Sequence, residues 1–145
     1  MIYLDTSYLV RLYFEDPGFV AVRSLAATDH VACAWHGQAE TMAAFHRKFR
    51  ERAIRQSHFD ALMVQFAADQ AGGAIAWLPV GPEILARIAR VYAHLPAAIY
   101  LRAADALHLA TAALHGHKVV FSNDRHLLAA APRFQIAGRN IIGSS

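Results

Sequence analysis

Short apolar segments alternate with longer helical stretches along almost the whole chain. Segments this short and this apolar are typical of strands buried on both faces, and such strands form parallel sheets covered by helices. The sequence therefore predicts an α/β fold in which a central parallel β-sheet is flanked by helices. Because the 145 residues contain no linker, repeat or low-complexity stretch, we expect one domain spanning residues 1–145.

Turn and cap residues set the expected bounds of these elements. The predicted strands cover residues 2–5, 30–35, 75–80, 118–122 and 134–137. The predicted helices cover residues 8–14, 17–27, 38–53, 57–70, 81–94, 99–114 and 124–130. Asp16-Pro17 has the N-cap and first residue of a helix start, Gly72-Gly73 ends a helix, and the tail after Gly138 is expected to be loose.

Asp105 lies in an alanine- and leucine-rich stretch that favours a helix. At about 100° per residue, Leu101, Leu109 and Ala112 surround it, and leucines also line the opposite side. A helix that is apolar all round is buried, so we expect Asp105 to be a buried carboxylate. Since an unpaired buried charge is costly, a basic partner, a hydrogen-bond network or a metal ion has to compensate it.

Three further acids are expected near one edge of the sheet. Asp5 ends the first predicted strand, Asp124 follows the fourth, and Glu40 lies near the start of the helix after the second. In open parallel sheets, ligands gather at the carboxyl ends of the strands. We therefore expect these three acids and Asp105 to lie together.

Four neighbouring carboxylates repel one another. A pair at about 4 Å costs about 4 kcal/mol when the effective dielectric constant is about 20. An oxygen-only ligand set favours Mg²⁺ or Mn²⁺ over zinc, and Mg²⁺ usually binds one or two carboxylates directly, with water and substrate phosphate completing the octahedron. Such a site can activate water and neutralise a phosphate during in-line displacement.

Each acid also has a structural explanation that the sequence leaves open. The two acids at strand ends can cap the helices that follow them, and Glu40 can pair with Arg47 on its own helix face. Within its own helix, Asp105 has only Arg102 and His108 as partners.

The histidines and the cysteine have simpler interpretations. His108 lies three residues after Asp105 and can reach the same metal ion, but we expect a packed side chain that hydrogen-bonds locally. The nine histidines lack zinc spacing and have no cysteine partners, which argues against a zinc site. The single cysteine, Cys33, is expected to be a small core residue of a strand; it excludes an internal disulfide and fits a reducing cytoplasm.

Several classes of protein are disfavoured. No charge-free run of about 18 apolar residues is present, so we expect no membrane span. The first residues lack the basic segment of a signal peptide, and we expect a cytoplasmic protein. No glycine-rich phosphate loop or dinucleotide fingerprint occurs, which argues against a nucleotide-binding enzyme.

Four of these segments resemble one known family. They are residues 4–9 (LDTSYL), the helix that carries Glu40, residues 105–110 (DALHLA) and residues 121–125 (FSNDR). In this order they resemble a PIN-domain nuclease, and more closely the VapC-type toxins of bacterial toxin–antitoxin pairs. The resemblance spans nearly the whole chain.

The resemblance implies a PIN-like three-layer fold and a ribonuclease that depends on Mg²⁺ or Mn²⁺. It maps the acidic quartet of the family onto Asp5, Glu40, Asp105 and Asp124. It also implies a supporting contact from Ser122, while Asn123 and Thr6 are further supporting candidates. Members typically form homodimers, and a small cognate antitoxin that inserts into the active-site groove holds them inactive.

Positive charge is concentrated in residues 47–55, which hold five cations against one acid. The formal net charge of +3 is a mild excess that is compatible with a polyanionic partner. Arg47, Lys48 and Arg50 are candidate contacts to RNA phosphates, and Arg47 is the best of them because it shares the helix face of Glu40. The stretch can equally contact an antitoxin or form a solvated face.

The sequence therefore predicts a metal-dependent endoribonuclease, the toxin of a toxin–antitoxin pair. Asp5 and Asp105 are expected to be direct metal ligands, and Asp124 a direct or water-mediated one. Glu40 is expected to be an outer ligand or a water-orienting base, and the resemblance implies products with 5′-phosphate and 3′-hydroxyl ends. The alternative is a catalytically silent PIN-like module that binds RNA or protein. A metal phosphatase or receiver-type domain is a further alternative, but a receiver needs an acidic pair where Asp5 has only Thr6-Ser7 after it.

Overall fold

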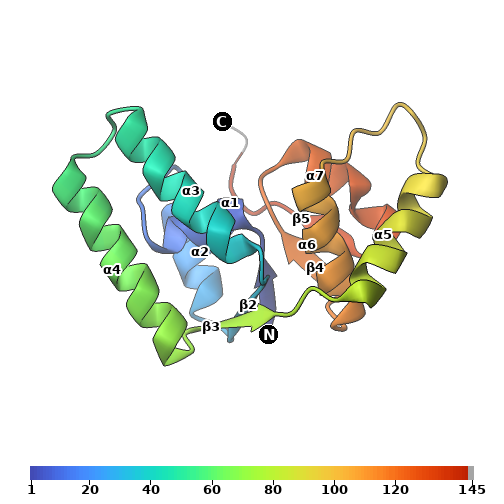
Figure 1. Ribbon diagram of the computed structural model, residues 1–145, viewed down its shortest axis with the longest axis horizontal. Helices are drawn as coiled ribbons and strands as arrows, with labels where there is room; N and C mark the ends of the chain where they lie inside the picture. Colours follow the sequence, from blue (N-terminus) through green and yellow to red (C-terminus); the bar gives the residue numbers. More distant parts are fainter. Residues whose placement is uncertain (144–145) are drawn as a thin grey trace.

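The computed structural model describes residues 1–143, and its centre is a five-stranded parallel sheet (Figure 1). The strands are β1 Ile2–Leu4, β2 Val31–Ala34, β3 Ile75–Leu78, β4 Val119–Phe121 and β5 Ala137–Arg139. Neighbouring strands pair in parallel in the order β3-β2-β1-β4-β5.

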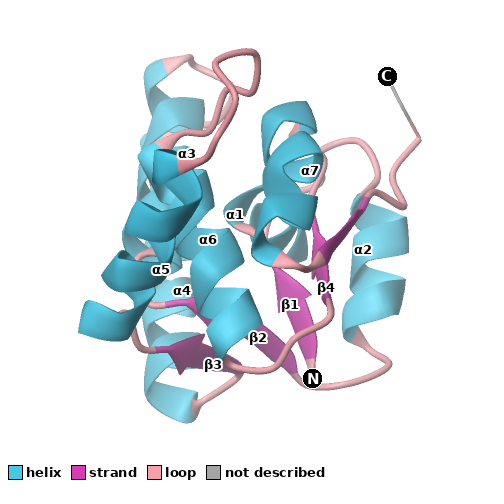
Figure 2. Cartoon of the chain, turned by 90° about the vertical axis from the view of Figure 1, so that its right-hand side faces the viewer, coloured by secondary structure: helices cyan, strands magenta, loops and turns pink. Residues whose placement is uncertain are grey.

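Helices cover both faces of the sheet (Figure 2). They are α1 Thr6–Leu9, α2 Phe19–Ala26, α3 Gly37–Arg50, α4 Gln56–Gly72, α5 Pro82–Ala93, α6 Ala103–Leu114 and α7 Arg125–Ala130. Two short 3₁₀ helices, η1 Val10–Leu12 and η2 Ala131–Phe134, continue from α1 and α7. The predicted α/β three-layer fold is thus confirmed.

Alternate residues of the strands face two separate hydrophobic cores. Tyr3 and Ala32 pack on one face with residues of α5, α6 and α7. Leu4 and Cys33 pack on the other face with residues of α1 and α2, and Cys33 is fully buried, as predicted. Because successive side chains of a strand point to opposite faces, short strands covered on both sides are apolar throughout.

The connection order of the sheet creates a crevice between β1 and β4. The chain runs from β1 outward to β3 and then returns to the other side of β1 with β4. At such a reversal the connections leave in opposite directions, and the space beyond the strand ends is open for a ligand. Asp5 directly follows β1 and Ser122 directly follows β4, so both lie at this crevice.

The predicted start of the second helix was wrong. Asp16-Pro17 does not begin a helix; α2 begins two residues after Pro17, at Phe19. Gly18 lies between them in the left-handed region at φ 88°, a conformation that breaks a regular helix and favours glycine. The side chain of Arg11 donates a hydrogen bond of 2.8 Å to the carbonyl of Pro17 and thereby holds the turn.

The predicted bounds of the last strand were wrong, since β5 covers Ala137–Arg139 rather than residues 134–137, and the tail after Gly138 is not loose at residues 140 and 141. Residues 144–145 lie outside the described residues. Phe134 ends the 3₁₀ helix η2 and is buried in the core, and Gln135 at φ 58° turns the chain before β5 begins. Residues beyond β5 are held by Tyr8, whose hydroxyl donates to Asn140 Oδ1 at 2.8 Å and accepts the Ile141 N–H at 2.7 Å. These contacts join residues more than 130 positions apart, which a local pattern does not reveal.

Several predicted helices are shorter than expected, among them the one predicted over residues 38–53, which is α3 Gly37–Arg50. The stretch 8–14 is divided between α1 and η1, and α6 begins at Ala103 rather than at residue 99. Arg102 has an extended backbone, with φ −77° and ψ 151°, and forms the N-cap of α6. Within residues 1–143, no helix is both long and apolar enough to cross a membrane.

Candidate active site

The four predicted acids line one pocket beyond the ends of β1 and β4. It has a volume of about 230 Å³ and is lined by Asp5, Thr6, Ser7, Glu40, Arg102, Asp105, His108, Asn123 and Asp124. The supporting candidates Thr6 and Asn123 therefore also lie at the pocket, and the parallel topology explains why segments so distant in sequence meet here.

Asp5 is held by three donors. Its Oδ1 accepts hydrogen bonds from the Ser7 hydroxyl at 2.6 Å and the Tyr8 N–H at 3.1 Å, so it caps α1. Its Oδ2 accepts the Ser122 hydroxyl at 2.5 Å. Burial raises the pKa of Asp5 above its usual range, although the charge of His108 and these hydrogen bonds oppose the shift.

Asp124 caps the next helix in the same way. Its Oδ1 accepts the N–H groups of His126 and Leu127 at 2.8 and 3.1 Å, and its own N–H donates to Ser122 Oγ at 2.9 Å. Burial tends to raise the pKa of Asp124, but the two N–H groups and Arg102 outweigh it and lower the pKa. The capping explanation thus holds for this acid and for Asp5, while both remain at the pocket.

Arg102 compensates the buried charge of Asp105. Its Nε donates to Asp105 Oδ2 at 2.8 Å, and its terminal nitrogen pairs with Asp124 Oδ2. Asp105 is 6% exposed, as the apolar helix predicts, and burial raises its pKa despite the arginine. The protein itself therefore supplies the basic partner that the sequence left open, and a metal ion is not the sole compensation for Asp105.

Side chains of three residues contact the Glu40 carboxylate. Its Oε1 accepts the Thr6 hydroxyl at 2.8 Å and lies 2.6 Å from His108 Nε2 and 3.3 Å from His36 Nε2. It does not pair with Arg47, whose Nε lies 3.6 Å from Glu51. Burial tends to raise the pKa of Glu40, but the hydrogen bond and charge of His108 outweigh it and lower the pKa.

His108 is packed, as predicted, but its contacts are not local. It is 1% exposed, and its Nδ1 lies 2.8 Å from the hydroxyl of Tyr3 in β1. Burial tends to lower the pKa of His108, but Tyr3, Cys33 and Glu40 outweigh it and hold the pKa well above 6.5. The prediction of local hydrogen bonding was wrong because this face of α6 packs against β1 and the start of α3.

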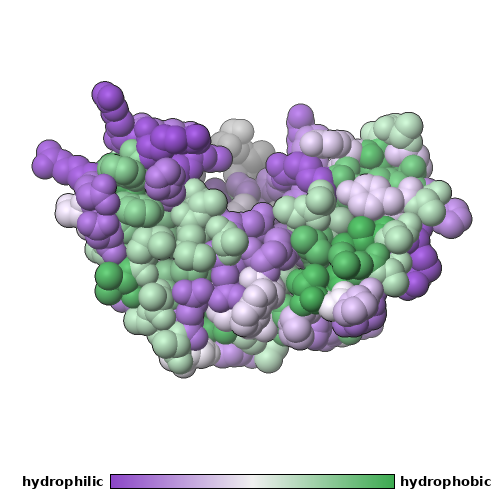
Figure 3. All heavy atoms as spheres, in the orientation of Figure 1, coloured by the Kyte–Doolittle hydropathy of each residue, from purple (hydrophilic) through white to green (hydrophobic). Residues whose placement is uncertain are grey.

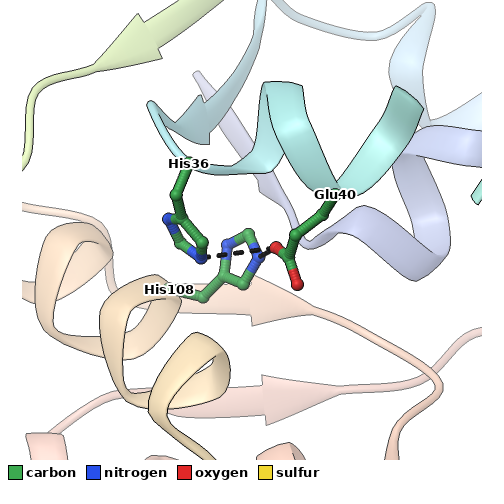
Figure 4. Close-up of side chains that lie close together, drawn as sticks. All are labelled: His36, Glu40 and His108. Atoms are coloured by element: carbon green, nitrogen blue, oxygen red, sulfur yellow. Dashed lines mark hydrogen bonds and ion pairs between the residues drawn. The ribbon is translucent and has the colours of Figure 1, made fainter. Parts of the chain in front are cut away.

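His36 was missed by the sequence analysis. It precedes α3, and its ring lies 4.3 Å from the ring of His108, centroid to centroid (Figure 4). Burial, together with the charge of His108, lowers the pKa of His36 to about 4. The available signal was its spacing to Glu40, since residues four apart on a helix lie on one face.

A second groove adjoins the acidic pocket and carries part of the basic stretch. It has a volume of about 340 Å³, and Thr6, Ser7 and Asn123 line both cavities. Arg47 and Lys48 line the groove, but Arg50 does not. In Figure 3, hydrophilic atoms gather at the upper left, where α3 ends and connects to α4.

Lys48 is less available to a ligand than its charge suggests. Its Nζ lies 2.8 Å from both carboxylate oxygens of Asp16 and 3.9 Å from the ring centroid of Phe14. The side chain of Arg47, in contrast, is 69% exposed. Arg47 is therefore a better contact for an anion than Lys48.

The sequence model of the PIN domain matches residues 2–132. The chain belongs to the PIN domain family. No curated protein matches it. That the four acids of the pocket form the acidic quartet of this PIN domain stays a prediction.

Solved structures share the fold of this PIN domain. FitAcB from Neisseria gonorrhoeae superposes with a TM-score of 0.74 at 18% identity, covering 97% of both chains. VapC20 of Mycobacterium tuberculosis, described as a Sarcin-Ricin loop cleaving toxin, gives 0.70 at 19% identity over 90% of this chain and 95% of its own. VapBC2 from Rickettsia felis, bound to a promoter DNA fragment, gives 0.67 at 13% identity over 97% and 98%. At these identities the similarity establishes a common fold.

The donor set of the acidic pocket fits a hard divalent cation. Four carboxylates from different elements line it, and such oxygens are the ligands that Mg²⁺ and Mn²⁺ prefer. Within residues 1–143, Asp105 Oδ1 and Glu40 Oε2 accept no hydrogen bond and are free to bind a further ligand.

Proposed function

We propose that this PIN domain is an endoribonuclease that depends on Mg²⁺ or Mn²⁺. The observation that carries the proposal is the convergence of four carboxylates in one pocket, where two of them are substantially buried. Neither capping nor ion pairing requires four acids from four segments at one point. A divalent cation and a phosphodiester are the ligands that this charge arrangement suits.

Asp5, Asp105 and Asp124 would hold the cation, with Glu40 in an outer position. When bound, the cation activates a water molecule and neutralises charge on the phosphate. Ser122 keeps Asp5 and the backbone of Asp124 in register, since its hydroxyl donates to the first and accepts from the second.

Glu40 orients the attacking water. Its lowered pKa keeps it ionised at neutral pH, so it accepts a hydrogen bond readily but is a weak proton acceptor. Thr6 and His108 hold Oε1, which leaves Oε2 for the water. The sequence predicted an outer ligand or a water-orienting base, and of these we propose the water-orienting role.

Arg102 supplies positive charge to the phosphate. Its side chain is 45% exposed, and its planar group already reaches two of the acids. A guanidinium matches the geometry of phosphate oxygens. When a cation binds Asp105 and Asp124, Arg102 is released from them and contacts the RNA phosphate.

The RNA backbone runs from the acidic pocket along the adjoining groove. Arg47 and Arg11 line this groove, and Asn123 lies where it meets the pocket. Products with 5′-phosphate and 3′-hydroxyl ends follow from the family resemblance.

The toxin role rests on the relatives. VapC20 is described as a cleaving toxin, and VapBC2 was solved bound to a promoter fragment. We infer that this chain is likewise the toxin of a pair, acts in the cytoplasm as a homodimer, and is inhibited by a small antitoxin that enters the pocket. The alternative, a catalytically silent binding module, is disfavoured by the complete set of acids.

RNA cleavage by the purified protein tests the proposal. Cleavage is expected with Mg²⁺ or Mn²⁺ and is expected to disappear with EDTA, or with Asp5→Asn or Asp105→Asn when the variant is folded. Undiminished cleavage under either condition would exclude the mechanism. Binding of RNA without cleavage by the wild type would favour the silent module. For the toxin role, expression alone should stop growth, and expression with the small gene directly upstream should restore it.

A further inference from the structure

His36, Glu40 and His108 form a compact group beside the acidic pocket. One potential ligand atom from each lies within 4.8 Å of the other two. In Figure 4 both imidazole rings face the Glu40 carboxylate, with His36 and Glu40 on the α3 side and His108 on α6. The group therefore joins two helices that are otherwise separate in sequence.

The chemistry of this group differs from that of the acidic pocket. Imidazole nitrogens suit zinc-type transition ions, whereas Mg²⁺ prefers oxygen alone. Two histidines with one glutamate form a known ligand set for zinc with one position left for water. The donors of one tetrahedral zinc ion lie about 3.4 Å apart, given bonds of about 2.0–2.1 Å. The spacing observed here is close enough for small side-chain rotations to reach that geometry.

The surroundings support the group as a ligand set. The Tyr3 hydroxyl lies 2.8 Å from His108 Nδ1, so the ring is oriented with Nε2 toward Glu40. A partner on the second ring nitrogen is the usual outer support of a metal-binding histidine. His36 Nδ1 is buried without a hydrogen-bond partner among the described residues, and Nε2 lies 3.1 Å from the carbonyl oxygen of Ala104, a contact that a metal ion on Nε2 would replace.

We propose that His36, Glu40 and His108 bind one zinc-type transition-metal ion, at a site separate in ligand chemistry from the carboxylates that hold Mg²⁺ or Mn²⁺. The pocket lined by Thr6, Glu40 and His108 leaves an open side for water. Because Glu40 also lines the acidic pocket, a metal ion bound at the histidine site partly neutralises the negative charge of Glu40 that faces that pocket. The site extends the proposed nuclease function but does not depend on it.

Titration of the full chain with Co²⁺ in excess Mg²⁺ tests the site directly. Four-coordinate Co²⁺ absorbs strongly in the visible region, and Mg²⁺ keeps the carboxylates occupied. We expect one Co²⁺ per chain, displaced by Zn²⁺. Loss of an outer support weakens metal binding by about 10–100-fold, so His36→Gln, which removes a ligand, should weaken it by at least about 100-fold.

Matched variants separate this site from the other possibilities. His94→Gln changes an exposed histidine of another region and should leave Co²⁺ binding unchanged. Asp105→Asn should also keep Co²⁺ binding, although it removes RNA cleavage if the proposed function is correct. Glu40→Gln provides a second ligand variant, checked for folding by circular dichroism, and should also lose binding. Equal Co²⁺ binding by the wild type and His36→Gln, or loss of binding in Asp105→Asn or His94→Gln, would overturn the proposal.

Discussion

Arg102 Nε lies 2.8 Å from Oδ2 of Asp105, three residues further along the chain. The same guanidinium reaches Asp124, so one exposed arginine joins two acids of the pocket. Asp105 is therefore a paired carboxylate rather than an uncompensated buried charge, because the N-cap residue of its own helix supplies the basic partner. This pairing also makes the stability and the activity of the site separable by mutation.

Arg102→Gln is expected to lower stability more than Asp105→Asn does. Removing the arginine leaves two close carboxylates unpaired, and the cost should be about 1–2 kcal/mol, below that of a fully buried pair because the guanidinium is about half exposed. Asp105→Asn should change the unfolding free energy by less than about 1 kcal/mol, since the amide oxygen still accepts from Arg102 and no charge is buried. Urea denaturation in EDTA measures the unfolding free energy of both variants. A large loss of unfolding free energy in Asp105→Asn would mean that the Asp105–Arg102 pair has mainly a structural role.

The raised pKa of Asp5 has a defined consequence for stability against pH. The folded protein binds this proton more tightly than the unfolded chain does, so the contribution of Asp5 to stability falls as the pH rises from about 4 through the raised pKa. An asparagine at this position does not titrate. The unfolding free energy of Asp5→Asn, minus that of the wild type, should therefore increase with pH across this range. If this difference in unfolding free energy decreases with pH instead, the pKa of Asp5 is lowered rather than raised in the folded protein.

Tyr3→Phe is expected to destabilise the protein by about 1–3 kcal/mol. The Tyr3 hydroxyl accepts the Ala34 N–H at 3.0 Å and contacts His108, and both groups are buried. Without the hydroxyl these buried polar groups lose a partner. Tyr100→Phe, at an exposed tyrosine, is the matched control and should have little effect. Thermal or urea unfolding compares the two variants, and equal stability would mean that the Tyr3 contacts contribute little.

We expect Arg47, Lys48 and Arg50 to contribute unequally to RNA binding, because they are placed differently relative to the groove. Arg47→Ala should weaken binding and reduce the slope of log affinity against log salt by about 0.7, the value for one phosphate contact on a single strand. Arg50→Ala should leave the slope unchanged because Arg50 does not line the groove. Lys48→Ala should mainly lower stability, since Lys48 is paired with Asp16. Fluorescence anisotropy on a catalytically inactive background measures the slopes, and equal effects of Arg47→Ala and Arg50→Ala would argue against the proposed RNA path.

Much of the fold was predictable because its determinants are local. The apolar strands and the capping residues Asp5 and Asp124 indicate a parallel sheet with acids at its carboxyl edge. The predicted bounds of elements were wrong where a contact between distant residues decides the conformation. Examples are β5 and the residues after it, which Tyr8 holds.

The sequence by itself determined the strand–helix alternation, the burial of Asp105 and the gathering of four acids at one edge. Only the tertiary structure decided which charges pair. Lys48 forms an ion pair with Asp16, and Glu40 contacts His108 and His36 rather than Arg47. Such choices depend on the rotation and separation of packed helices, and helical periodicity does not specify either of them. The metal-binding potential of the histidines became visible for the same reason, because α6 places His108 beside the start of α3.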